Sequence, residues 1–187
     1  YLMMGLLEEG SGDMDAQAFA AAQEALAASF SFDVYDDTVS ISVRFLTENR
    51  AESLALLKTV LTQPRFDPEA IERVRAQVLS ILASDAQDPE SVAGATWSQL
   101  AFGDHAYGAS RKGTVSSIAA LSRDDIAAAH AMLFVRDTLF VSAVGDISEA
   151  ELGPLLDNLL GGLPAGGGLK TAPVEFAMKG GLTVVDL

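Results

Sequence analysis

The chain has 187 residues, of which 49% are apolar, with a mean hydropathy of +0.26 and a formal net charge of −14. This length predicts one compact domain whose core needs neither disulfides nor a structural metal. The apolar composition excludes disorder, which requires low hydrophobicity together with high charge. The acidic balance argues against a nucleic-acid partner, because phosphates need a basic face. No apolar stretch reaches the roughly 20 residues that a membrane span requires.

Helical patterns dominate the chain, and two of the helix starts are marked clearly. Pro68 and Pro89 each follow an aspartate and precede a glutamate, which is the pattern of a helix N-terminus. Apolar periodicity and capping boxes predict helices over 1–9, 14–28, 47–62, 67–86 and 88–102, with further helices beginning at Ser122 and Ser148. Residues 103–117 are polar and punctuated by glycine, which predicts a loop.

Two alternating segments predict an antiparallel hairpin. Apolar residues occupy even positions in 29–34 and odd positions in 38–45, so the parity changes across Tyr35-Asp36-Asp37, where the turn is expected. Thr138–Val144 is predicted as a buried strand, and residues 183–185 as the start of another. The fold class is therefore α+β, with a mostly antiparallel sheet packed with helices and short of strands.

Nucleophilic and metal-binding side chains are scarce. The absence of cysteine excludes a disulfide framework, a thiolate zinc site and a cysteine nucleophile. The two histidines, His105 and His130, have no second histidine or acid at a recognised ligand spacing, which favours structural or surface roles. Neither a glycine-rich phosphate loop nor a G-x-S-x-G turn is present. Chemistry alone therefore nominates no active site.

Several segments, taken together, resemble the insulinase/pitrilysin-type zinc peptidases (inverzincins), a family that includes the mitochondrial processing peptidase. The segments are Leu6-Leu7-Glu8-Glu9-Gly10, the hairpin from Ser29 to Phe45, Arg65-Phe66-Asp67 with residues 71–75, residues 102–108 with Gly113-Thr114 and Ile118, and Val144-Gly145-Asp146-Ile147. They follow one consistent order over almost the whole chain. The resemblance implies the α+β fold of the N-terminal domain of these peptidases. It makes residues 1–187 a single domain, expected to be a fragment of the first insulinase-like domain that is truncated at its N-terminus, with the second domain absent.

The family's zinc site consists of an H-x-x-E-H motif on a helix and a distal glutamate. Alignment on residues 6–10 places the first histidine on Tyr1, the catalytic glutamate on Met4, the second histidine on Gly5 and the distal glutamate on Ile81. The resemblance therefore implies no catalytic residue and no metal ligand in this chain, with zinc expected in an active partner. The alternative is that a true motif precedes residue 1. The helix predicted over 67–86 argues against it, because it contains no glutamate beyond Glu72.

Peptide substrates of the family add to a sheet edge, where main-chain hydrogen bonds supply affinity. The equivalent residues here, expected to bind substrate, are Ser29, Phe30, Ser31 and Phe32. The family's Asn-Ala pair falls near Phe30-Ser31, so the sequence departs from the family at this strand.

The resemblance implies a non-catalytic subunit or inactive domain that pairs with an active H-x-x-E-H subunit, or with a second copy of itself, to form a peptide-degrading chamber. It also indicates a bacterial, periplasmic protein. Two alternatives stay open. One is a structural or peptide-binding scaffold of the same fold with no peptidase role. The other, disfavoured by the scarcity of histidine and cysteine, is an enzyme with an unrecognised site.

Overall fold

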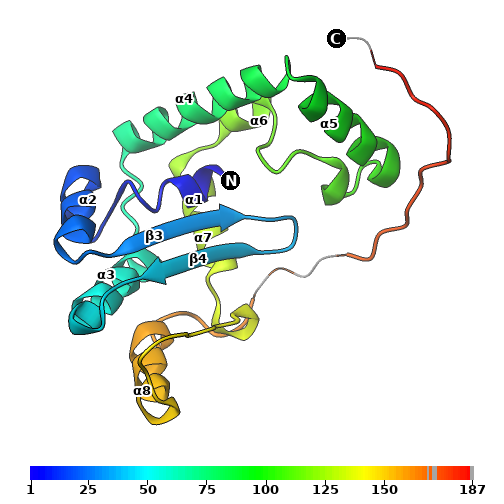
Figure 1. Ribbon diagram of the computed structural model, residues 1–187. Coiled ribbons are helices and arrows are strands. Elements are labelled where there is room, and N and C mark those ends of the chain that lie inside the picture. The colour runs from blue at the N-terminus through cyan, green and yellow to red at the C-terminus, as the bar shows by residue number, and fades with distance from the viewer. Residues whose placement is uncertain (168, 170–171, 186–187) are drawn as a thin grey trace.

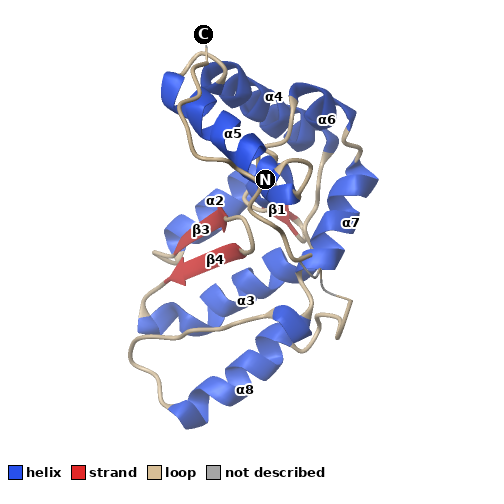
Figure 2. Cartoon of the chain, turned by 90° about the vertical axis from the view of Figure 1, so that its right-hand side faces the viewer, coloured by secondary structure: helices blue, strands red, loops and turns tan. Residues whose placement is uncertain are grey.

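Helices surround a two-stranded hairpin in the computed structural model, which describes residues 1–167, 169 and 172–185 (Figure 1). The helices are α1 (Leu2–Gly5), α2 (Ala16–Ala25), α3 (Arg50–Thr62), α4 (Pro68–Asp85), α5 (Pro89–Phe102), α6 (Val115–Ala120), α7 (Arg123–Leu133) and α8 (Glu149–Leu160). The strands are β1 (Gly10–Ser11), β2 (Met14–Asp15), β3 (Ser29–Val34) and β4 (Val39–Arg44). Helices α4, α5 and α6 lie on one side of the hairpin, and α3 lies between the hairpin and α8 (Figure 2). This arrangement confirms the predicted α+β fold class.

The predicted hairpin is confirmed in position and register. β3 and β4 pair antiparallel with Phe30 opposite Val43 and Phe32 opposite Ile41. The turn closes when the Tyr35 amide donates to the Thr38 carbonyl at 2.8 Å. Apolar side chains of both strands pack against the core on one face, while serines and Asp33 occupy the other face. Alternation of apolar and polar residues therefore sets which face is buried.

The core gathers around α1. Its residues Leu2, Met3 and Met4, with Leu6 and Leu7 just beyond it, are all buried and contact the hairpin, α4 and α7. In the same core, Phe19 of α2 is fully buried and meets Phe30 of β3 edge-on, with ring centroids 5.9 Å apart. α1 is shorter than the predicted helix over 1–9, because its last residue is Gly5 and the chain turns before Gly10 enters β1.

Side-chain caps begin several helices as the sequence predicts. Asp88 accepts from the Ser91 amide at the start of α5, and Ser122 and Ser148 form capping boxes that begin α7 and α8. A further capping box at Thr114 begins α6 inside the segment that the sequence predicts to be a loop. The glycines of that segment predict a loop, and a helix of only six residues is too short to show a clear apolar periodicity.

Two predicted strands are wrong within the described residues. Residues 139–144 are extended but pair with no strand in the described part of the chain, and Phe140 and Val144 are 98% and 101% exposed. Residues 183–185 are likewise not a strand, and Val184 is 77% exposed. Apolar and β-branched residues by themselves do not make a strand. A strand also needs a hydrogen-bonded neighbour, which a local pattern does not specify.

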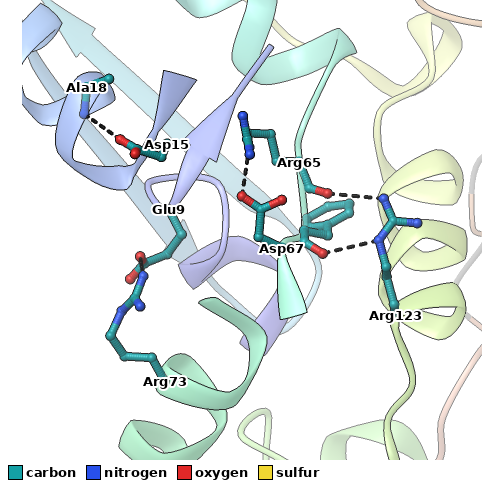
Figure 3. Close-up of polar contacts among 8 residues, drawn as sticks. Glu9, Asp15, Ala18, Arg65, Asp67, Arg73 and Arg123 are labelled. Atoms are coloured by element: carbon teal, nitrogen blue, oxygen red, sulfur yellow. Dashed lines mark hydrogen bonds and ion pairs between the residues drawn. The ribbon is translucent and has the colours of Figure 1, made fainter. Parts of the chain in front are cut away.

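Ion pairs and one arginine fasten the start of α4 to its surroundings (Figure 3). Arg73 of α4 pairs with Glu9, and Arg65 pairs with Asp67 at 2.7 Å. Arg123 donates to the carbonyl of Arg65 and, through Nε, to that of Phe66, both at 3.1 Å. Phe66 is buried and holds a left-handed φ of +50°, a conformation that costs energy in a residue with a side chain. Arg123 therefore secures a strained connection between α3 and α4.

Replacing this arginine is expected to destabilise the protein. Arg123→Ala leaves two carbonyls without their donor and should lower the free energy of unfolding by about 1–3 kcal/mol. Urea titration followed by circular dichroism measures the effect. Arg44→Ala is the matched control, because Arg44 is exposed and makes no side-chain hydrogen bond or ion pair with the described residues. Equal stability of the two variants would remove Arg123 from this role.

His130 is a half-buried histidine that packs against the core rather than belonging to a site. Its ring lies between Phe66 and Phe134, and its Nε2 has no hydrogen-bond partner among the described residues. Burial lowers the pKa of His130, and a hydrogen bond with the Leu61 backbone partly opposes this shift. Burial therefore favours the neutral form of the imidazole in the folded protein.

The lowered pKa predicts a stability that depends on pH. An unfolded histidine, with a pKa near 6.5, binds protons more readily than the folded one, so stability is complete above that pH. It should fall as the pH drops from about 6.5 towards the folded pKa. Urea unfolding at pH 7.5, 6.5 and 5.5 measures this slope. His130→Phe should flatten it and His105→Phe should not; a slope that survives His130→Phe would assign it to other groups.

Candidate functional site

A cavity of about 350 Å³ lies between α1, β3 and α4. Tyr1, Met4 and Gly5 line it from the first turn of the chain, and Val74, Val78 and Ile81 line it from α4. The remaining wall is made by Gln77 and by the consecutive residues Phe32, Asp33, Val34 and Tyr35. The structure thus brings together all four positions on which the aligned zinc motif falls.

Helical spacing explains why these residues converge. Tyr1, Met4 and Gly5 are related by three and four positions, which puts them on one side of a single helical turn. Val74, Val78 and Ile81 follow the same rule along α4. The missing side chain of Gly5 lets the two helices approach closely, since a Cβ there would lie 3.3 Å from Cγ1 of Val74. The first turn and α4 therefore form two facing walls.

The chemistry of this cavity does not fit zinc. Structural and catalytic zinc sites need at least three nitrogen, oxygen or sulfur ligands from the protein. Gly5, Val74 and Ile81 offer no donor atom, Met4 offers only a thioether, and Tyr1 offers one phenol. Across the described residues, no cluster of three or more histidine, aspartate or glutamate side chains is placed to hold a metal ion. Three of the four aligned positions, Met4, Gly5 and Ile81, are apolar where a zinc peptidase would carry polar side chains.

The free edge of β3 forms one rim of the cavity. Because Tyr35 and Thr38 are a hydrogen-bonded pair, the alternation of an antiparallel ladder directs the backbone of Ser29, Ser31 and Asp33 towards β4. Phe30, Phe32 and Val34 direct their amides and carbonyls outward. The guanidinium of Arg111 reaches the Val34 carbonyl at 3.3 Å, as this outward direction requires.

The four residues expected to bind substrate therefore divide into two pairs. Ser29 and Ser31 use their backbone within the hairpin, so only Phe30 and Phe32 present backbone groups at the free edge. Phe30 is buried, whereas Phe32 is partly exposed and lines the cavity. Phe32 is thus the residue of this set whose backbone and side chain both lie at the site.

Residues 105–112 hold the tip of the hairpin in place, a role that sequence reasoning missed. The Tyr107 hydroxyl donates to Asp37 at 2.5 Å, and this hydrogen bond raises the pKa of Tyr107. Arg111 pairs with Asp36 at 3.4 Å, and Lys112 pairs with Asp85 at the end of α4. The opposite charges of Asp36 and Arg111 are visible in the sequence, but their pairing depends on the fold.

Similar proteins share this fold. A "non-peptidase homolog YmxG" from Helicobacter pylori is 30% identical over 165 residues, 88% of this chain and 38% of its own length. A mitochondrial-processing peptidase subunit beta from Blastocladiella emersonii is 28% identical over 125 residues, 67% of this chain and 27% of its own. A solved "peptidase M16 inactive domain" from Pseudomonas fluorescens has a TM-score of 0.87 and 27% identity, covering 93% of this chain and 42% of that one. No family model matches the chain.

The chain spans about two fifths of the length of the first curated relative and of the first solved structure that it matches. The likeness to this solved structure extends over 93% of the chain. Within the described residues, no helix has the length and apolar content needed to cross a membrane.

Proposed function

The chain is a degenerate member of the insulinase-like (M16) zinc peptidase family, and on this premise we propose that it is a non-catalytic subunit or domain that pairs with an active H-x-x-E-H subunit to form a peptide-degrading chamber. The observation that supports this function is the cavity at the motif positions. The cavity lies between α1 and α4. Met4 occupies the aligned position of the catalytic base, and Gly5 and Ile81 occupy the aligned positions of two zinc ligands. A subunit of this kind contributes walls and binding surface while its partner performs the chemistry.

An exposed apolar segment supports a role within a larger assembly. Residues 139–144 form an extended apolar segment that has no strand partner among the described residues, and Phe140 and Val144 are almost fully exposed. Exposed strands with apolar side chains attract other chains, so stable proteins cover them. We propose that residues 1–187 belong to the first of two insulinase-like domains. The partial coverage of the matched relatives is consistent with that placement.

Cleavage assays with separated and mixed subunits test the proposed function. The purified protein alone should hold no stoichiometric zinc by metal analysis and should leave peptides intact. An active paralogue carrying H-x-x-E-H should copurify with it, and peptide cleavage should appear or rise in the mixture. About one tightly bound zinc ion per chain would refute the non-catalytic role. Failure of any peptidase to copurify would favour a scaffold with no peptidase role.

A further inference from the structure

We propose that residues 172–177 form a strap that docks on the C-terminal end of α5 and thereby holds the tip of the β3–β4 hairpin in place. The strap runs beside the end of α5 on the surface of the molecule (Figure 1). The hairpin next to its tip carries Val34 and Tyr35, which line the cavity. Docking of the strap fixes this rim of the cavity, and release of the strap loosens it.

Hydrogen bonds attach the strap at both of its ends. The Ala177 amide donates to the Ala101 carbonyl at 2.9 Å. Ala101 lies in the last turn of α5, where carbonyls have no partner within the helix, so the strap supplies a donor that the helix lacks. Nε2 of His105 lies 3.3 Å from the Ala172 carbonyl. Because Nδ1 of His105 accepts from the Tyr107 amide, the ring proton is on Nε2 and is donated to the strap.

One aromatic side chain packs the strap against α5. The ring centroid of Phe176 lies 6.0 Å from that of Phe102 and 6.3 Å from that of Trp97. Trp97 and Phe102 meet edge-on at 5.8 Å, so the three rings form one aromatic cluster. Trp97 is 48% exposed and Phe176 is 61% exposed, which places the cluster at the surface.

The aromatic cluster reaches the hairpin through Tyr107. The Tyr107 ring meets Phe102 edge-on at 5.6 Å and packs against His105 at 4.7 Å. Its hydroxyl donates to Asp37 at the hairpin tip. A continuous row of contacts therefore joins Phe176 of the strap to Asp37. Release of the strap removes support from the side of this row that faces away from the hairpin.

The strap is able to release while the core stays folded. All of its residues except Val174 are exposed, so the ring of Phe176 and the two hydrogen bonds carry most of its attachment. The conformational entropy of six ordered residues opposes docking. Segments with few buried contacts open independently of the rest of a protein. The docked and released states of the strap are therefore close in free energy.

Amide hydrogen exchange measured by NMR tests both parts of the proposal. Phe176→Ala removes the aromatic contacts of the strap and should speed exchange of the Ala177 amide about two- to tenfold. It should also speed exchange of the Tyr35 amide, which closes the hairpin turn. The Ser31 amide lies further along β3 and should exchange at an unchanged rate.

Tryptophan fluorescence reports docking of the strap directly, because Trp97 is the one tryptophan of the chain. Phe176→Ala should increase quenching of Trp97 by acrylamide. Phe176→Tyr keeps the ring and should match the unmodified protein. Glu175→Ala is the matched control on the strap, because Glu175 is exposed and makes no side-chain hydrogen bond or ion pair with the described residues. This control should change neither quenching nor exchange.

A double substitution tests the route through Tyr107. Tyr107→Phe lacks the hydroxyl that donates to Asp37, so the strap has lost its connection to the hairpin tip in this variant. Phe176→Ala should therefore raise Tyr35 exchange less in the Tyr107→Phe background than in the unmodified protein. Strictly additive effects on Tyr35 exchange would overturn this route.

The remaining outcomes decide between docking and coupling. Unchanged exchange at Ala177 together with unchanged quenching of Trp97 in Phe176→Ala overturns docking of the strap. Faster exchange at Ala177 without any change at Tyr35 overturns the coupling to the hairpin. An equal rise at Ser31 would show a general loss of stability and also overturns the proposal. None of these results depends on whether a peptidase copurifies with the protein.

Discussion

A variant carrying Tyr1→His, Met4→Glu, Gly5→His and Ile81→Glu is expected to bind about one zinc ion per chain, whereas the unmodified protein binds none. The four positions line one cavity, so the two introduced imidazoles and the introduced distal carboxylate can approach a common point. Three protein ligands with an open fourth position are what a catalytic zinc site requires. Equilibrium dialysis followed by metal analysis measures the stoichiometry.

The close contact at Gly5 sets the main cost of this variant. A Cβ at this position lies 3.3 Å from Cγ1 of Val74, so Val74 must give by a few tenths of an ångström. The matched control keeps Gly5 and makes the other three substitutions, which leaves two ligands and should abolish tight binding. A folded quadruple variant that takes up no zinc would show that the alignment on residues 6–10 is in the wrong register.

Local patterns predicted the parts of this fold that local interactions determine. The hairpin register follows from the change of parity across residues 35–37, and the capping box at Ser122 needs only residues four positions apart or fewer. The strand predicted at residues 139–144 is wrong, because strand pairing depends on a neighbouring strand that is distant in sequence or in another chain. These residues have strand propensity and apolar character, but neither property determines which strand they would pair with.

The candidate site was predicted by resemblance and not by chemistry. Tyr1, Met4, Gly5 and Ile81 carry no functional signature, and only alignment to a zinc motif singled them out. Their meeting around one cavity is a property of how α1 packs against α4. The contribution of Arg111 to the strand edge could not have been predicted, because it joins residues 77 positions apart.

Met4→Glu alone is expected to be strongly destabilising, by roughly 2–4 kcal/mol at neutral pH. Met4 is 1% exposed, and no lysine or arginine lines the cavity with it. A carboxylate introduced at position 4 would therefore lose its hydration and gain no lysine or arginine side chain from the described cavity wall. Burial raises the pKa of such a carboxyl group above its usual value near 4.3.

The sign of this shift gives the loss a characteristic pH dependence. In the window between the unfolded and the raised folded pKa, the folded state binds more protons, so stability falls as the pH rises. Urea unfolding at pH 4.5, 6 and 8 should show the destabilisation growing with pH. Met4→Gln, which is polar but uncharged, should cost a constant amount, and Val115→Glu at a 61% exposed position should cost little. Identical pH profiles for Met4→Glu and Met4→Gln would contradict the argument.

The same energetics couple position 4 to the metal. In the quadruple variant, a bound zinc ion would supply the positive charge that the cavity lacks, so added zinc should recover stability that Met4→Glu alone cannot. Stability of the quadruple variant should therefore rise with zinc concentration, while that of Met4→Glu stays unchanged. An acid at this depth is tolerable only beside a cation, and a chain without the metal is stabilised by an apolar residue there. The apolar residue at position 4 and the absence of the metal ligands are therefore energetically linked.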